Sequence, residues 1–183
     1  MGHTKPRVII TYLPFKRYCH SFLNKWPSLI YLGIMASLVN QNRAPFCYVD
    51  LHGHSIKKNS FLFGCESSAD VLALPRLMNS LPTFSMMNCR FQLTRDRCAR
   101  TVVYRRLGVL RSYTLESTYN GCDQGSLNGM QITESELSEL GVGLLGSIYS
   151  LRCQNIKGRT TLPQTTNVLP NESGNSCDES DEY

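Results

Sequence analysis

The chain has 183 residues, of which 42% are hydrophobic, and it carries a formal net charge of +5. This length and apolar content suit one folded domain and exclude a wholly disordered protein. The longest apolar-rich run, residues 29–39, is shorter than the roughly 20 residues that cross a bilayer, so we expect no membrane attachment.

Eight cysteines are spread along the chain, and none forms the C-x-x-C motif of metal or redox sites. We interpret them as reduced thiols rather than as a disulfide framework, which indicates a reducing, cytoplasmic location. Residues 1–49 contain no Asp or Glu but six Lys and Arg. Such a start is also typical of a transit peptide, so that alternative stays open.

Composition divides the chain into three parts. Residues 1–43 are basic and show no sustained hydrophobic period, so we predict an irregular segment. Residues 44–152 alternate apolar runs with turn residues and are predicted to fold. Residues 153–183 are rich in Thr, Asn, Ser and Pro and end in acidic residues, which predicts a disordered acidic tail.

The folded part begins with two short apolar runs, which predict β-strands at 46–51 and 60–63. Residues 69–78 favour a helix that Pro75 interrupts. Residues with high β-propensity predict three further strands, at 89–93, 101–104 and 112–117.

The last predicted element is a helix. Thr133 and Glu136 have the spacing of a capping box. Apolar residues then recur at helical steps, at Leu137, Leu140, Leu144, Ile148 and Leu151. The three glycines at 141, 143 and 146 are predicted to let this helix approach a sheet closely. Strands interleaved with helices predict an α/β fold.

Three polar residues stand out beside these strands. His52, in a His-Gly-His triplet, is either part of a polar loop or a metal ligand at a strand end. Glu116 ends an uncharged strand and is either a satisfied strand-end carboxylate or a general base. Arg100 precedes a β-branched run, where a buried guanidinium needs an anionic partner from the chain or from a ligand.

Three stretches together carry a family resemblance: "YVDLHGHSIKKNSFLFGC" (48–65), "ARTVVYRRLGV" (99–109) and "RSYTLESTYNGCDQG" (111–125). They resemble the M14 zinc carboxypeptidases, and among these the cytosolic carboxypeptidases that shorten polyglutamate chains on tubulin. The "GCDQG" ending resembles the branch of the Purkinje-cell-degeneration carboxypeptidase. The resemblance covers about residues 44–152 and implies the C-terminal portion of the mixed-sheet carboxypeptidase fold with flanking helices.

The resemblance also implies roles for the three polar residues. His52 matches the family's third zinc ligand, and Glu116 matches the catalytic glutamate, which takes a proton from zinc-bound water and passes it to the leaving amine. Arg100 resembles the basic residue that meets an acidic side chain of the substrate. The implied function is zinc-dependent removal of C-terminal glutamates from acidic protein tails such as polyglutamylated tubulin. His54 is interpreted as a supporting or surface histidine.

The sequence departs from the family at the other zinc ligands. The family takes them from an upstream His-x-x-Glu motif, and no Glu precedes Glu66 in this chain. One of the three expected ligands is therefore recognisable, and residues 1–43 are not family-like. We expect an incomplete catalytic domain that is inactive alone, with a non-catalytic binder of acidic tails as the alternative.

Seven arginines lie between residues 90 and 111. Such density also suits nucleic-acid binding, but neither an RNP-like aromatic pattern nor a helix-turn-helix pattern accompanies it. We interpret these arginines as a basic face that attracts acidic tails, and we expect no nucleic-acid partner.

Overall fold

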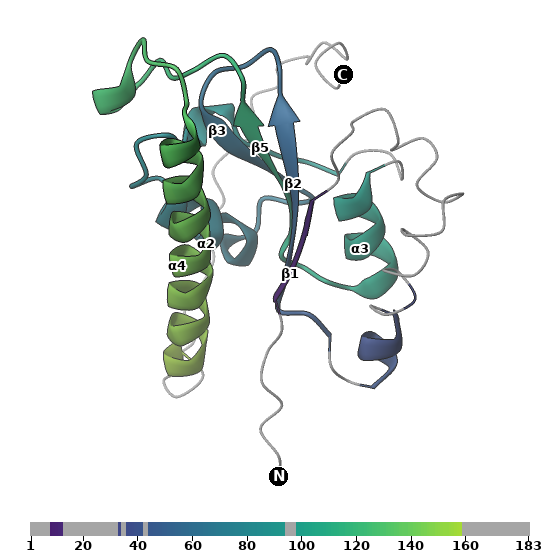
Figure 1. Cartoon of the computed structure of the whole chain (residues 1–183). Coiled ribbons are helices and arrows are strands. Elements are labelled where there is room, and N and C mark those ends of the chain that lie inside the picture. The colour runs from purple at the N-terminus through teal and green to yellow at the C-terminus, as the bar shows by residue number, and fades with distance from the viewer. Residues whose placement is uncertain (1–7, 13–32, 34–35, 42–43, 94–97, 159–183) are drawn as a thin grey trace, which may run out of the picture.

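A computed structural model describes residues 8–12, 33, 36–41, 44–93 and 98–158. Its centre is a five-stranded mixed sheet with helices on both faces, which confirms the predicted α/β class (Figure 1). In sheet order the strands are β1 (Val8–Tyr12), β2 (Cys47–His54), β5 (Ser112–Thr118), β3 (Ser60–Gly64) and β4 (Arg90–Phe91).

Strand β2 lies parallel to both β1 and β5, whereas β3 lies antiparallel to β5 and parallel to β4. The first half of β2 is buried without alternation, as expected for a central strand covered on both faces. The strand predicted to end at Leu51 continues through His54. The His-Gly-His triplet therefore forms the last three residues of a strand and is not a loop.

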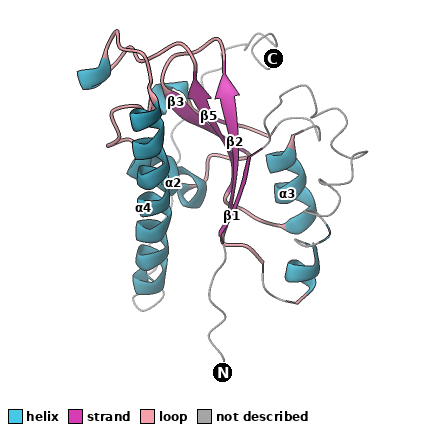
Figure 2. Ribbon diagram, in the orientation of Figure 1, coloured by secondary structure: helices cyan, strands magenta, loops and turns pink. Residues whose placement is uncertain are grey.

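Helices α2 (Ala69–Met78) and α4 (Glu134–Gly158) lie on one side of the sheet, and α3 (Ala99–Leu107) lies on the other (Figure 2). Two short 3-10 helices, η2 (Met86–Asn88) and η3 (Gly125–Leu127), interrupt the loops. None of the described helices combines the length and apolar character that crossing a membrane requires.

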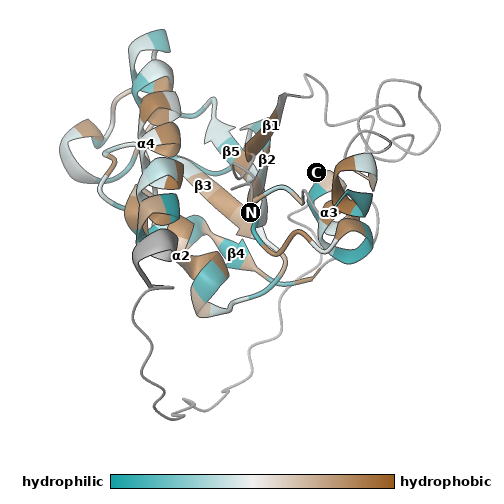
Figure 3. Cartoon of the chain, turned by 90° about the horizontal axis from the view of Figure 1, so that it is seen from below, coloured by the Kyte–Doolittle hydropathy of each residue, from teal (hydrophilic) through white to brown (hydrophobic). Residues whose placement is uncertain are grey.

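The larger apolar cluster includes residues of β2, β3 and β5 together with residues of α2 and α4, among them Val49, Leu62 and Leu115. Figure 3 shows β3 as a largely hydrophobic strand, with α2 and α4 on one side and α3 on the other. A smaller cluster under α3 consists of Tyr48, Ala99, Val103 and Val109. Each face of the sheet thus has its own apolar cluster, one with α2 and α4 and the other with α3.

The predicted capping box of α4 is confirmed. The backbone N–H of Thr133 donates to the Glu136 carboxylate at 2.8 Å, and the N–H of Ser135 donates to the Thr133 hydroxyl at 3.3 Å. The Thr133 hydroxyl also donates to the Glu136 carboxylate, and this bond, together with the one from the Thr133 N–H, lowers the pKa of Glu136. The first turn of α4 is therefore fixed by local hydrogen bonds, independently of the sheet.

The apolar face of α4 is confirmed except at its first residue. Leu140, Leu144, Ile148 and Leu151 are buried, whereas Leu137 is 46% exposed. Among the three glycines, only Gly143 makes a close approach, because a Cβ there would lie 2.5 Å from a methyl carbon of Leu81. The neighbour is thus a side chain just beyond α2, and not the sheet as predicted.

The strand predicted at 101–104 is wrong, because these residues lie within α3. Thr101, Val102 and Val103 have high β-propensity, but β-branched residues are only mildly unfavourable in a helix. Burial of one face of α3 against β2 and β5 outweighs that small cost. Gly108, at φ 64°, then ends the helix in the left-handed conformation that glycine favours.

Pro75 lies inside α2 and does not break it. Because proline has no N–H, the carbonyl of Val71, four residues earlier, lacks its usual helical donor. The buried Tyr113 hydroxyl of β5 donates to this carbonyl at 2.7 Å. The sheet therefore supplies the hydrogen bond that the helix cannot make, and burial raises the pKa of Tyr113 well above its usual value.

We expect Tyr113→Phe to lower the free energy of unfolding by about 1–3 kcal/mol, because the buried Val71 carbonyl would lose its donor. Urea denaturation followed by circular dichroism measures the effect. Tyr149→Phe is the matched control, since Tyr149 is 67% exposed on α4. Equal stability of the two variants would contradict the role of the Tyr113 hydroxyl.

The described cysteines, at 47, 65, 89, 98, 122 and 153, are free thiols. Burial raises the pKa of Cys47 to about 12 and that of Cys89 to about 11, so both are protonated at neutral pH. Two buried thiols of the core therefore behave as small apolar groups.

Two segment boundaries differ from the sequence prediction. Residues 8–12, inside the segment predicted to be irregular, form β1 and pair with β2. Helix α4 continues to Gly158, past the predicted domain end at residue 152. The remainder of the predicted tail, residues 159–183, lies outside the described residues, as do residues 94–97.

Candidate active site

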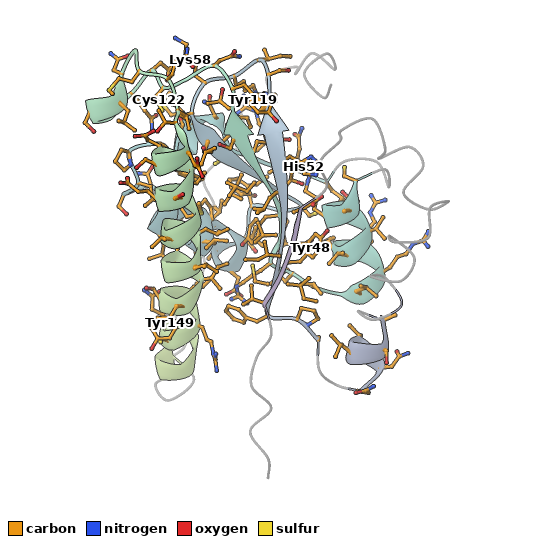
Figure 4. All side chains as sticks on the ribbon, viewed as in Figure 1. Tyr48, His52, Lys58, Tyr119, Cys122 and Tyr149 are labelled. Carbon is orange, nitrogen blue, oxygen red and sulfur yellow. The ribbon has the colours of Figure 1, made fainter. Side chains whose placement is uncertain are left out.

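Two polar residues lie side by side near the carboxyl ends of β2 and β5. His52 is the register partner of Glu116 in the parallel pair, and Asp50 is the partner of Thr114. Partners in register present their side chains on the same face of a sheet, and residues two apart on a strand share that face. The sheet therefore brings the predicted metal ligand and the predicted base together, and Figure 4 shows His52 on the α3 side of β2.

The orientation of His52 is set by its neighbour on the same strand. The imidazole Nε2 lies 2.8 Å from the carboxylate Oδ2 of Asp50, and the two side chains are 9% and 2% exposed. Since a carboxylate only accepts hydrogen bonds, Nε2 carries the proton and donates it. In the neutral ring the lone pair then lies on Nδ1, which is the form of histidine that binds metals.

Glu116 is 4% exposed, and its partner in the antiparallel pair on the other side is Phe61 of β3. His54 packs edge-on against the Phe61 ring, with centroids 5.1 Å apart, and is buried. On this face of the sheet, Glu116 thus lies between its two register partners, His52 and Phe61. Of the two sequence interpretations of His54, the surface position is wrong because the residue is buried, and the supporting role stays a prediction.

Arg100 is the second residue of α3 and is 5% exposed. Its guanidinium donates to the Thr114 hydroxyl at 3.3 Å, and its carbonyl accepts from the Ser112 hydroxyl at 2.8 Å. Thr114 lies two residues before Glu116 and on the same face. The structure therefore places all three predicted site residues on one face, although Arg100 comes from a helix and not from a strand.

Several curated proteins are similar to this chain in sequence. The chain is 41% identical over 138 residues to human cytosolic carboxypeptidase 1, with 62% of this chain and 11% of the relative covered. It is 35% identical over 161 residues to the Xenopus laevis protein of that name, covering 76% and 13%. Mouse cytosolic carboxypeptidase 4 is 38% identical over 130 residues, covering 60% and 12%. In sequence, the chain is therefore homologous to one segment of the cytosolic carboxypeptidases.

Solved structures give the same fold at lower identity. A metallo-carboxypeptidase from Pseudomonas aeruginosa superposes with a TM-score of 0.57 at 14% identity, covering 72% of this chain and 38% of that one. One from Burkholderia cenocepacia gives 0.57 at 13% identity, covering 74% and 38%. No family model matches the chain. The chain therefore has part of the metallocarboxypeptidase fold, and it spans 11–13% of the length of these curated cytosolic carboxypeptidases.

The metallocarboxypeptidase relatives imply a metal, and His52 would fit one ligand position because Asp50 fixes its ring. A catalytic zinc takes three protein ligands. Within residues 8–12, 36–41, 44–93 and 98–158, no three His, Cys, Asp or Glu side chains gather as a metal site. The described part of this cytosolic carboxypeptidase relative thus fits a single ligand and not a complete zinc site.

The loops after β2 and β5 are tied together by residues that sequence reasoning did not single out. Asn59, at φ 63°, exchanges side-chain hydrogen bonds with Asp123, one of them from the Asp123 N–H at 3.2 Å. Asn120 donates from its side chain to the carbonyls of Ser55 and Ile56. These bonds join the carboxyl ends of the His52 and Glu116 strands. Only Asn59 in the first loop and the Asn120-Gly121 pair in the second hinted at such turns.

Gly53 separates the two histidines because Tyr119 lies across it. A Cβ at Gly53 would lie 1.9 Å from the Tyr119 hydroxyl oxygen. Tyr119 follows β5, and its N–H donates to the His54 carbonyl at 2.9 Å. A side chain at position 53 would therefore displace the exposed Tyr119 ring, on the face away from His52.

Replacing Asp50 with Asn should weaken zinc binding at His52 by about 10–100-fold, because the amide no longer favours a proton on Nε2 and a lone pair on Nδ1. Isothermal titration with zinc measures the change. Asp70→Asn is the control, since Asp70 is an exposed residue of α2 that pairs with Arg111. Unchanged zinc affinity in Asp50→Asn would contradict the orienting role of Asp50.

Proposed function

We propose that this chain contributes to a zinc-dependent metallocarboxypeptidase that removes C-terminal glutamates from polyglutamylated or acidic protein tails, such as those of tubulin, in the cytoplasm. The observation that carries the proposal is the register pair His52–Glu116, with Arg100 fixed on the same face. The family relationship supports peptide-bond hydrolysis at a carboxyl terminus.

Glu116 would perform the proton transfers. Bound zinc would polarise the scissile carbonyl and activate a water molecule. The Glu116 carboxylate would accept a proton from the attacking water and return it to the leaving amine. Its position between His52 and Phe61 supports this role, because it places the carboxylate beside the proposed zinc ligand.

Arg100 would hold the side chain of the departing glutamate. Its guanidinium is largely buried, and a carboxylate brought beside it gains a charge-assisted hydrogen bond in a poorly solvated setting. The Thr114 hydroxyl restricts the orientation of the guanidinium. This position supports selectivity for glutamate over residues with neutral side chains.

The incomplete set of metal ligands favours a second function. Because the described residues present one ligand position and not three, the 183-residue chain alone would act as a non-catalytic binder of acidic tails. The same Arg100 would then provide the affinity, and Glu116 would be dispensable for binding.

One experiment separates the two functions. The purified chain is mixed with zinc and a peptide ending in three glutamates; binding is followed by fluorescence anisotropy and released glutamate by mass spectrometry. We expect binding without release, and equal binding by Glu116→Gln. Release that stops in Glu116→Gln would assign complete catalysis to this chain. Absence of binding would contradict both functions.

A further inference from the structure

Two aromatic residues of β3 lie side by side next to the candidate site. Phe61 and Phe63 are two residues apart, and their ring centroids lie 5.4 Å from each other at an interplanar angle of 72°. Phe61 is the register partner of Glu116, and Phe63 is that of Thr114. Both rings therefore share the face of Glu116 and Arg100.

One cationic side chain lies over each ring. The guanidinium carbon of Arg100 lies 5.3 Å from the Phe63 centroid, and the ammonium nitrogen of Lys57 lies 5.8 Å from the Phe61 centroid. Both distances fall within the roughly 6 Å range of cation–π attraction. Arg100 therefore lies beside the cross-strand pair Thr114–Phe63, and Lys57 lies beside the pair Glu116–Phe61.

The backbone of Lys57 is fixed to β5. The Thr118 hydroxyl, two residues after Glu116, donates to the Lys57 carbonyl at 2.6 Å. The side chain is half-buried, and no carboxylate of the described residues pairs with its ammonium group. Lys58 differs, because it is exposed and its carbonyl accepts from the Asn88 side chain at 3.0 Å. Figure 4 labels Lys58 at the outer end of the molecule.

We propose that Lys57 is a second anion-binding residue of this site, which takes the side chain of the acidic residue preceding the terminal glutamate. This inference rests on the proposed function, in which Arg100 takes the terminal side chain. Arg100 and Lys57 each lie over one of two adjoining rings on the face of Glu116, so both cations border the same part of the site. The ligand that suits two such cations is a run of acidic residues.

The test compares two peptides that end in Glu-Glu or Gln-Glu, measured by fluorescence anisotropy with the full chain and with Lys57→Met and Lys58→Met. We expect the full chain to bind the Glu-Glu peptide about fivefold more tightly, as suits one half-exposed charge pair. Lys57→Met should bind both peptides equally, and Lys58→Met should keep the preference. Methionine keeps most of the aliphatic stem over Phe61, and a thermal melt verifies folding.

The outcomes separate this inference from the proposed function. If both peptides bind equally to the full chain, but a Gln-Gln peptide binds more weakly, the terminal site stands and the role of Lys57 is overturned. A preference that survives in Lys57→Met also overturns it. If all three peptides bind equally, or none binds, both the proposed function and the role of Lys57 are overturned.

Discussion

Replacing Arg100 with Met is expected to reduce the affinity for a peptide ending in glutamate about 100-fold, roughly 3 kcal/mol. Arg100 is 5% exposed, so a ligand carboxylate brought beside its guanidinium is largely withdrawn from water. Without the guanidinium, that carboxylate would lose its charged partner and keep its desolvation cost. Anisotropy titration of the same peptide against both proteins measures the loss.

The matched control is Arg106→Met, which removes the same charge from the exposed end of α3. It should change the affinity less than threefold at physiological salt, because exposed charges are screened. A peptide ending in glutamine tests specificity and should bind the wild type and Arg100→Met alike. If Arg100→Met weakens both peptides equally, Arg100 supports the fold and does not read the side chain.

Leu144→Ala is expected to lower the free energy of unfolding by about 3 kcal/mol. Leu144 is 2% exposed and belongs to the apolar cluster that joins α4 to α2 and the sheet. Removing its side chain leaves a cavity that the neighbouring residues fill only partly, so both the transfer free energy and the packing are lost. Urea denaturation of the purified chain measures the difference.

Leu145 provides the control within the same turn of α4. It is 56% exposed, so Leu145→Ala should change the stability by less than about 0.5 kcal/mol. Similar losses for both variants would mean that α4 is buried on both faces in solution. A negligible loss for Leu144→Ala would mean that α4 does not pack on the sheet as described.

Local patterns in the sequence were enough for the elements that depend on neighbouring residues. The capping box at Thr133 and the bounds of α2 follow from spacing and propensity, and both are confirmed. Helix α3 was mistaken for a strand because its β-branched run has the composition of one, and only packing against β2 and β5 decides between the two. Pro75 was expected to interrupt α2 because proline lacks an N–H, and the compensating donor, the Tyr113 hydroxyl, lies 42 residues after Val71.

The candidate site was identified residue by residue, but its arrangement was not. His52 and Glu116 become neighbours because β5 inserts between β2 and β3, a pairing that no local pattern shows. Lys57 escaped notice for a similar reason, since its relation to Glu116 depends on Phe61 in the antiparallel pair. Long-range strand pairing, and not side-chain chemistry, is what the sequence leaves undetermined here.

The most direct test of the account is a zinc titration of the full chain followed by ¹H–¹⁵N spectra of the histidine rings, with His52→Ala for assignment. The account predicts that zinc shifts the Nδ1 signal of His52 and leaves the His54 ring unaffected, and that His52→Ala loses this binding. Zinc that binds with the same affinity to His52→Ala would show that His52 is not a metal ligand, and would remove the basis for a metallocarboxypeptidase site at the ends of β2 and β5.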